Sequence, residues 1–173
     1  MATEPRFHLT TRDHAILQAL ADGWRGARSP YLLALEQKLR ASALAFSDDI
    51  PAGVVTLDSR VAYTVNGGPA GPHVLVQDDA PDLPDDRISV RTMRGLALLG
   101  LPEGAAATVD LGNGASEELR VVEVLSQPEA EARRRAAGPS TATGATVVSF
   151  RPRAAASLTE SGPDDDDPGP RAA

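Results

Sequence analysis

Five aspartates within one short stretch form the largest group of candidate metal ligands in the sequence. They are Asp78, Asp79, Asp82, Asp85 and Asp86. A calcium loop needs oxygen ligands at alternating positions and a glycine at its sharp turn. Pro81 and Pro84 interrupt this stretch, which contains no glycine, so the sequence predicts a solvated charged loop instead of a metal site. The later run of aspartates, 164–167, has no fixed geometry and predicts a solubilising tail.

The other residue types that support catalysis are too few, or too far apart, to form a site. The chain has no cysteine, and His8, His14 and His73 do not have the spacing of metal ligands. No serine lies in the strained glycine turn of a hydrolase. No glycine-rich loop carries a lysine for phosphate, since the only lysine, Lys38, falls within a predicted helix. We therefore expect a protein without enzymatic activity, bound metal or cofactor.

The overall charge argues against direct binding of a polyanion. The 173 residues include 17 Lys+Arg and 24 Asp+Glu, which gives a formal net charge of -7. Aromatic residues make up 3%, too few for a surface on which unpaired bases stack. The N-terminus lacks the apolar core of a signal peptide, and no apolar run approaches the roughly 20 residues that cross a bilayer. These observations predict a cytoplasmic protein that binds neither a membrane nor, directly, a nucleic acid.

Two helices are predicted within residues 10–47. The first starts where Thr10 precedes Asp13 by three positions, an arrangement that satisfies the free amides of a first turn. The second starts at Ser29 and Pro30, because proline lacks only an amide hydrogen that the first turn leaves unpaired. Its apolar residues follow steps of three and four, which predicts an antiparallel helical hairpin. These residues are Leu32, Leu35, Leu39 and Phe46, with Ser42 between the last two.

Short strands around one small helix are predicted for residues 53–128. Branched residues favour the strands, and the glycines on either side of Asn113 predict a turn between the last two of them. This order is typical of an α+β domain with an antiparallel sheet and one short helix. The predicted strands are 54–57, 60–65, 73–77, 87–90, 106–111 and 118–125, and the predicted helix is 94–99.

The last segment, 129–173, is rich in Ala, Arg, Pro and Gly and contains little that could form a core. Only 145–150 has the composition of a short extended stretch. The arginine cluster 133–135 lies beside acidic residues and is too short to indicate a nucleic-acid site. We expect this segment to be a disordered tail.

Several stretches of the middle segment occur in a specific order. They are Val54–Val61, Ile88–Val90, Gly95–Leu101 and Leu119–Ala130. In this order they resemble the C-terminal domain of the Gre transcription factors and, within that superfamily, the regulator of nucleoside diphosphate kinase (Rnk) family. The resemblance covers residues from about 10 to about 131. It implies an FKBP-like domain without isomerase activity, preceded by a helical hairpin, and binding to bacterial RNA polymerase at its secondary channel.

The tip of the predicted hairpin, 22–28, differs from that of a Gre factor. The resemblance implies a tip with two carboxylates, which help to hold a second Mg²⁺ for transcript hydrolysis. Here the tip offers only Asp22, and Arg25 and Arg28 would repel a divalent cation. We therefore expect a protein that competes with Gre-type factors for the polymerase without stimulating transcript cleavage.

Trp24 is the tip residue with two alternative roles. Tryptophan and arginine are enriched in interface hot spots, so Asp22, Trp24, Arg25 and Arg28 are candidate partner-binding residues. Alternatively, Trp24 folds back and closes the core of the hairpin. A second function is also open: the leucine seam is compatible with a self-associating or other protein-interaction module unrelated to polymerase, although we expect a monomer. A DNA-binding helix-turn-helix is not favoured, because the tip is too long.

Overall fold

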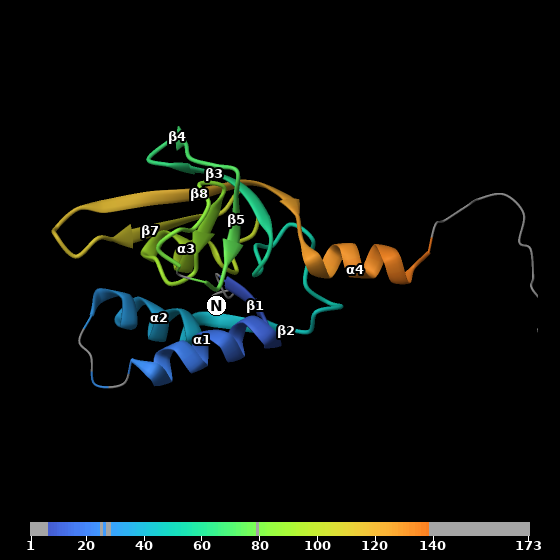
Figure 1. Cartoon of the computed structure of the whole chain (residues 1–173), viewed down its shortest axis with the longest axis horizontal. Coiled ribbons are helices and arrows are strands. Elements are labelled where there is room, and N and C mark those ends of the chain that lie inside the picture. The colour runs from blue at the N-terminus through green and yellow to red at the C-terminus, as the bar shows by residue number, and fades with distance from the viewer. Residues whose placement is uncertain (1–6, 25, 27–28, 79, 139–173) are drawn as a thin grey trace, which may run out of the picture. The chain divides into compact units, whose positions relative to one another are not determined.

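The computed structural model describes residues 7–24, 26, 29–78 and 80–138, which belong to one compact unit (Figure 1). The predicted tail from 139 to 173, with its aspartate run, lies outside the described residues. Within the described part, no helix is both long and apolar enough to cross a bilayer. No group of three or more histidine, cysteine or acidic side chains in this part is placed to hold a metal ion.

Two helices follow one another near the N-terminal end of the described chain. Helix α1 spans Thr11–Gly23 and helix α2 spans Pro30–Ala41, and they lie side by side (Figure 1). Both predicted caps are confirmed. Thr10 Oγ1 accepts a hydrogen bond from the amide of Asp13 at 3.0 Å, and Ser29 Oγ accepts one at 3.1 Å from the amide three residues later. Each bond satisfies an amide that the first turn leaves unpaired.

The second helix is shorter than the sequence predicts, because the chain leaves it at Ala41. Strand β2, Ser42–Ala45, pairs in parallel with strand β1, Phe7–Thr10. The hydroxyl of Ser42 donates to a carbonyl of the last helical turn at 2.7 Å, which helps to end the helix. The predicted helix through Phe46 is therefore wrong. Pairing with a strand that precedes α1 outweighs the helical spacing of the apolar residues, and Phe46 is 69% exposed.

A six-stranded sheet contains the remaining strands and confirms the mixed α+β class. They are β3 Arg60–Val65, β4 Gly68–Pro69, β5 His73–Val76, β6 Arg87–Ser89, β7 Ala106–Asp110 and β8 Ser116–Ser126. The order is β6-β5-β3-β8-β7, with β4 paired to β3. All pairs are antiparallel except β5 and β6, which are parallel. The prediction of an antiparallel sheet is wrong at this edge, because the connection from β5 returns the chain to the same end of the sheet.

The segment 54–57 is not a strand, contrary to the prediction. Only Val54 makes a bridge, to Pro102, and the segment is followed by Asp58, whose φ of 66° is left-handed. Its apolar side chains are nonetheless buried, and the amide of Val55 donates to Leu101 O at 3.0 Å. The branched residues that favour a strand therefore form a buried connection, whose backbone bonds go to a neighbouring loop.

The third helix, α3, spans Met93–Leu98 and packs close to the end of β6. A Cβ atom on Gly95 would lie 2.0 Å from the carbonyl oxygen of Ser89. The absence of a side chain at Gly95 therefore allows the first turn of α3 to lie against the backbone that follows β6.

The fourth helix, α4, spans Pro128–Ala136, where the sequence predicted the start of a disordered tail. That prediction is wrong for this segment. Glu129 and Ala130 are buried, and the guanidinium of Arg133 donates to Ser47 O at 2.7 Å and to Ile50 O at 2.8 Å. The composition is too polar to form a core of its own, but one face of the helix finds partners in a distant loop.

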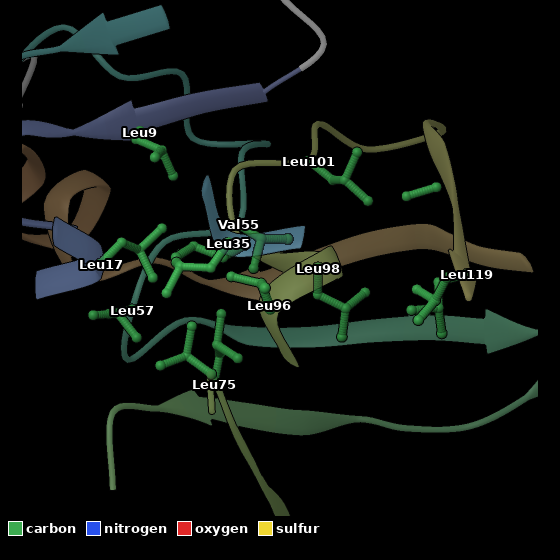
Figure 2. Packing of buried hydrophobic residues seen from close by; sticks show 14 of the residues in the cluster. Leu9, Leu17, Leu35, Val55, Leu57, Leu75, Leu96, Leu98, Leu101 and Leu119 are labelled. Atoms are coloured by element: carbon green, nitrogen blue, oxygen red, sulfur yellow. The ribbon is translucent and has the colours of Figure 1, made fainter. Parts of the chain in front are cut away.

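One hydrophobic core joins the helices to the sheet. Leu17 of α1 and Leu35 of α2 are fully buried together with Leu57, as Figure 2 shows. The same cluster continues to Leu75 on β5 and Leu119 on β8. The two helices therefore do not form a separate finger within the described part, because their apolar faces complete the core of the β-rich segment.

Candidate functional site

The predicted tip joins α1 to α2, and two of its candidate residues, Arg25 and Arg28, lie outside the described residues. Asp22 is exposed near the end of α1 and accepts a hydrogen bond from Gln18 Nε2 at 3.5 Å. Trp24 follows the helix, and its amide donates to Ala21 O at 3.2 Å. The described part of the tip therefore presents one carboxylate and one indole.

The indole of Trp24 is 41% exposed and packs on Tyr31 of α2. The two ring centroids are 5.9 Å apart, with the planes inclined by 47°. The hydroxyl of Tyr31 donates to Val90 O at 3.0 Å, and burial raises the pKa of this phenol to about 12, so it remains a donor at neutral pH. Trp24 thus has a packed face and an accessible face, and both of its predicted roles remain open.

A groove of about 460 Å³ lies between α2, α3 and β7. Its walls are largely apolar, and Leu33, which is 69% exposed, forms part of its rim. At one end, Pro30 lies close to Gly112, where an added Cβ would be 3.2 Å from the proline ring. The lining residues are Phe7, Pro30, Leu33, Ala34, Gln37, Lys38, Ala41, Met93, Leu96, Ala97, Ala107, Thr108, Val109 and Asp110.

Lys38 lies in the wall of this groove and is only 4% exposed. Its ammonium group donates to Ala97 O at 3.2 Å and lies 3.8 Å from the ring centroid of Phe7. Burial lowers the pKa of Lys38 well below its usual value. Within the described part of the chain, no carboxylate forms an ion pair with it. We call Phe7, Lys38 and Ala97 the lysine junction, because they connect β1, α2 and α3.

A second buried polar cluster connects α1, the 54–59 connection and α4. Asp13 Oδ2 accepts from the amide of Leu57 at 3.3 Å, and Thr56 Oγ1 donates to Glu129 Oε2 at 2.7 Å. Thr56 Oγ1 is also 2.9 Å from Ser59 Oγ, so Ser59 is the donor in that pair. We call these five residues the acid junction.

Asp13 is the electrostatically unusual member of the acid junction. Burial is the main cause that raises its pKa from 3.8 to about 6; the hydrogen bond from Leu57 lowers the pKa, and the nearby carboxylate of Glu129 raises it. Its other oxygen, Oδ1, is buried without a hydrogen-bond partner in the described structure. The carboxylate therefore joins elements distant in sequence, whereas the sequence assigned it only to the first turn of its own helix.

Comparison with known proteins gives the family of this chain. No family model matches the sequence. The regulator of nucleoside diphosphate kinase from Escherichia coli K12 is 31% identical over 102 residues, which cover 58% of this chain and 75% of that protein. The protein of the same name from Shigella flexneri matches with the same identity and coverage. This chain belongs to the regulator of nucleoside diphosphate kinase family.

The superfamily is supported by a solved structure as well. The prokaryotic transcription elongation factor GreA/GreB from Nitrosomonas europaea is 26% identical and aligns with a TM-score of 0.51. The alignment covers 70% of this chain and 98% of that chain. The predicted membership of the regulator of nucleoside diphosphate kinase family, and its likeness to the Gre factors, are thus confirmed.

For this family member, the sequence located the exposed elements better than the buried ones. The acidic loop is solvated as predicted, since Asp78, Asp82, Asp85 and Asp86 are exposed and Asp79 lies outside the described residues. Neither buried junction was predicted. For Lys38 a signal existed: the only lysine of the chain follows Leu35 by three positions and so shares its apolar helical face. For Asp13 no such signal existed, because its partners are distant in sequence.

Proposed function

We propose that this protein is a non-enzymatic regulator of transcription that binds bacterial RNA polymerase without stimulating transcript cleavage. Membership of a family of named regulators supports a regulatory role. The likeness to a protein named as a transcription elongation factor supports transcription as the process. The proposal includes binding at the secondary channel in competition with Gre-type factors, with α1 and α2 as the docking element beside an FKBP-like domain of residues 53–128.

The observation that carries the absence of cleavage in this proposal is the composition of the tip, together with the lengths of the two helices beside it. Asp22 is the only acidic residue between 22 and 28, whereas two-metal hydrolysis needs ligands for a second cation. The helices have 13 and 12 residues, so at about 1.5 Å per residue each spans roughly 20 Å. Both bury their apolar faces on the sheet. Such a tip is suited to docking rather than to deep insertion with catalytic ligands.

The proposal is tested by binding to core RNA polymerase. We expect the purified chain to be retained by immobilised polymerase at low salt and displaced by an excess of a Gre factor. Stalled elongation complexes that contain polymerase and RNA should release no shortened transcripts when the protein is added. Absence of binding would refute the proposed polymerase contact. Robust cleavage would refute the proposal that the protein does not stimulate transcript hydrolysis.

Trp24→Ala tests the tip as the contact surface. If the accessible face of the indole binds polymerase, this variant should lose affinity while its melting temperature stays near that of the unchanged protein. If the packing on Tyr31 is its main role, the melting temperature should fall and affinity should remain. Val122→Ala is the matched control, because Val122 is also a large exposed apolar residue but lies on β8. It should change neither property.

The alternative function is self-association or another protein contact unrelated to polymerase. Leu44, which is 58% exposed on β2, and Phe46, two residues later, are large exposed apolar side chains that favour this alternative. Light scattering after size-exclusion chromatography, at several concentrations, distinguishes the two. A stable dimer that loses its pairing in Phe46→Ser and shows no polymerase binding would support the alternative.

A further inference from the structure

The lysine junction places the buried Lys38 in the wall of a groove whose lining is mostly apolar. The groove volume of about 460 Å³ falls in the range of small-molecule sites. Leu33, Met93 and Leu96 contribute hydrophobic surface from α2 and α3, and Thr108 contributes a hydroxyl from β7. Mostly apolar walls with a few polar groups are typical of ligand pockets.

Within the described residues, the amino group of Lys38 has fewer partners than it has donors. A protonated lysine has three donors, and here the structure gives one bond, to Ala97 O, and the face of the Phe7 ring. No carboxylate of the described residues pairs with it, and burial is the only cause of its shifted pKa. A buried charge without an opposite charge is costly, so an anion that enters the groove would be stabilised there.

We propose that the groove binds a small monocarboxylic acid with an apolar tail, whose carboxylate pairs with the ammonium of Lys38. The apolar walls provide the surface for the tail, and the unpaired lysine provides the complementary charge. Asp110 is the one acidic residue in the lining, and its carboxylate is engaged at the turn, where Oδ1 accepts from the amide of Gly112 at 2.8 Å. This proposal does not depend on binding to polymerase.

Octanoate is a suitable probe, with octan-1-ol and octylamine as controls of equal length. In an NMR spectrum of the full chain labelled with ¹³C-lysine, the labelled signal comes from one residue, because Lys38 is the only lysine. We expect octanoate to shift this signal saturably, and octylamine to leave it unchanged. Octanol should bind more weakly than octanoate, because it lacks the charge. An unchanged signal at saturating octanoate would overturn the proposal.

Calorimetry with Lys38→Met provides an independent readout. Methionine keeps most of the volume of the side chain but removes the charge, so octanoate affinity should fall about tenfold to a hundredfold. Octanol affinity should remain unchanged, which shows that the groove is intact. Equal octanoate affinity in both proteins would overturn the proposal. If the variant does not fold, the titration of the lysine signal of the unchanged protein with octanoate is the deciding test.

Discussion

The acid junction and the lysine junction attach the same helix pair to the rest of the fold, yet they bury ionisable groups of opposite charge in different surroundings. At the acid junction, the buried carboxylates of Asp13 and Glu129 each accept a hydrogen bond from the 54–59 connection. At the lysine junction, Lys38 lies in the wall of a groove, and its partners among the described residues are the Ala97 carbonyl and the ring of Phe7. Asp13 thus changes the stability of the fold with pH, whereas Lys38 also lies beside a groove that has space for a ligand.

The largest loss of stability is expected from a substitution in the hydrophobic core that the helices on both junctions share with the sheet. Leu35 is fully buried on α2, so Leu35→Ala should lower the free energy of unfolding by about 2 to 5 kcal/mol. We expect one cooperative transition in urea, because helices and sheet share this core. Leu33→Ala, on the exposed side of the same helix, should change stability by about 0.5 kcal/mol or less. Separate transitions for helices and sheet would contradict the shared core.

Asp13→Asn isolates the acid junction. Because the pKa of Asp13 is raised from 3.8 to about 6, the folded protein holds this proton more tightly than the unfolded chain. The resulting stabilisation is complete below about pH 4 and is lost as the pH rises through about 6. At pH 8 the asparagine variant should therefore be more stable than the unchanged protein, by up to about 3 kcal/mol.

Urea unfolding of both proteins between pH 4 and pH 8 measures this difference. It should vanish at the acidic end, where Asp13 of the unchanged protein is protonated and neutral like asparagine. A difference that is constant with pH would show that the carboxylate is not the titrating group.

Lys38→Met should reveal the opposite pH dependence at the lysine junction. The lowered pKa means that the folded protein holds the lysine proton less tightly than the unfolded chain. Burial of Lys38 therefore lowers the free energy of unfolding at neutral pH. This loss disappears as the pH rises from the folded-state pKa of Lys38 towards 10.5, its value in the unfolded chain. Without ligand, the variant should be more stable than the unchanged protein at pH 7, with a smaller difference at pH 10. A Lys38→Met variant that is less stable than the unchanged protein at pH 7 would contradict this prediction.

A smaller effect is expected at the attachment of α4, next to the acid junction. Arg133→Ala removes two charge-assisted bonds to backbone carbonyls and should cost about 1 to 3 kcal/mol. The loss should appear first as faster amide hydrogen exchange in α4. Arg134→Ala is the matched control, because Arg134 is the exposed neighbour, and it should leave exchange unchanged. Equal exchange in both variants would show that Arg133 does not hold the helix.

The smallest effect is expected for the exposed ion pair beside the acid junction. Arg12 Nη2 lies 3.2 Å from Asp58 Oδ2, and both side chains are largely in solvent. A double-mutant cycle with Arg12→Ala and Asp58→Asn should give a coupling of about 0.2 to 1 kcal/mol that decreases with added salt. Asparagine tolerates the left-handed backbone at position 58. A coupling as large as the pH effect at Asp13 would remove the distinction between buried and exposed charges.

The features that the sequence predicted correctly depend on neighbouring residues. The caps at Thr10 and Ser29 are local, and so is the turn around Asn113, where Gly112 and Gly114 have φ values of 78° and 80°. The strand β3 and the hairpin of β7 and β8 follow from short-range alternation and turn residues in the same way. Such signals need no knowledge of the tertiary structure.

The features that the sequence failed to predict depend on distant residues. Strand β2 exists because β1, more than thirty residues earlier, lies beside it. Helix α4 is held by carbonyls in the 47–50 loop. The burial of Lys38 and Asp13 likewise depends on elements that the chain brings together only on folding. The candidate tip was identified from its sequence, but its role in binding remains a prediction.

Gly95 has a consequence for how the family diverges. Any side chain at this position would overlap the carbonyl of Ser89, and backbone atoms cannot move aside as a flexible side chain does. Mutations here are therefore expected to be removed by selection even where most of the surrounding sequence has drifted. A glycine six residues after the end of β6 should thus help to detect remote homologues whose overall identity is too low for recognition.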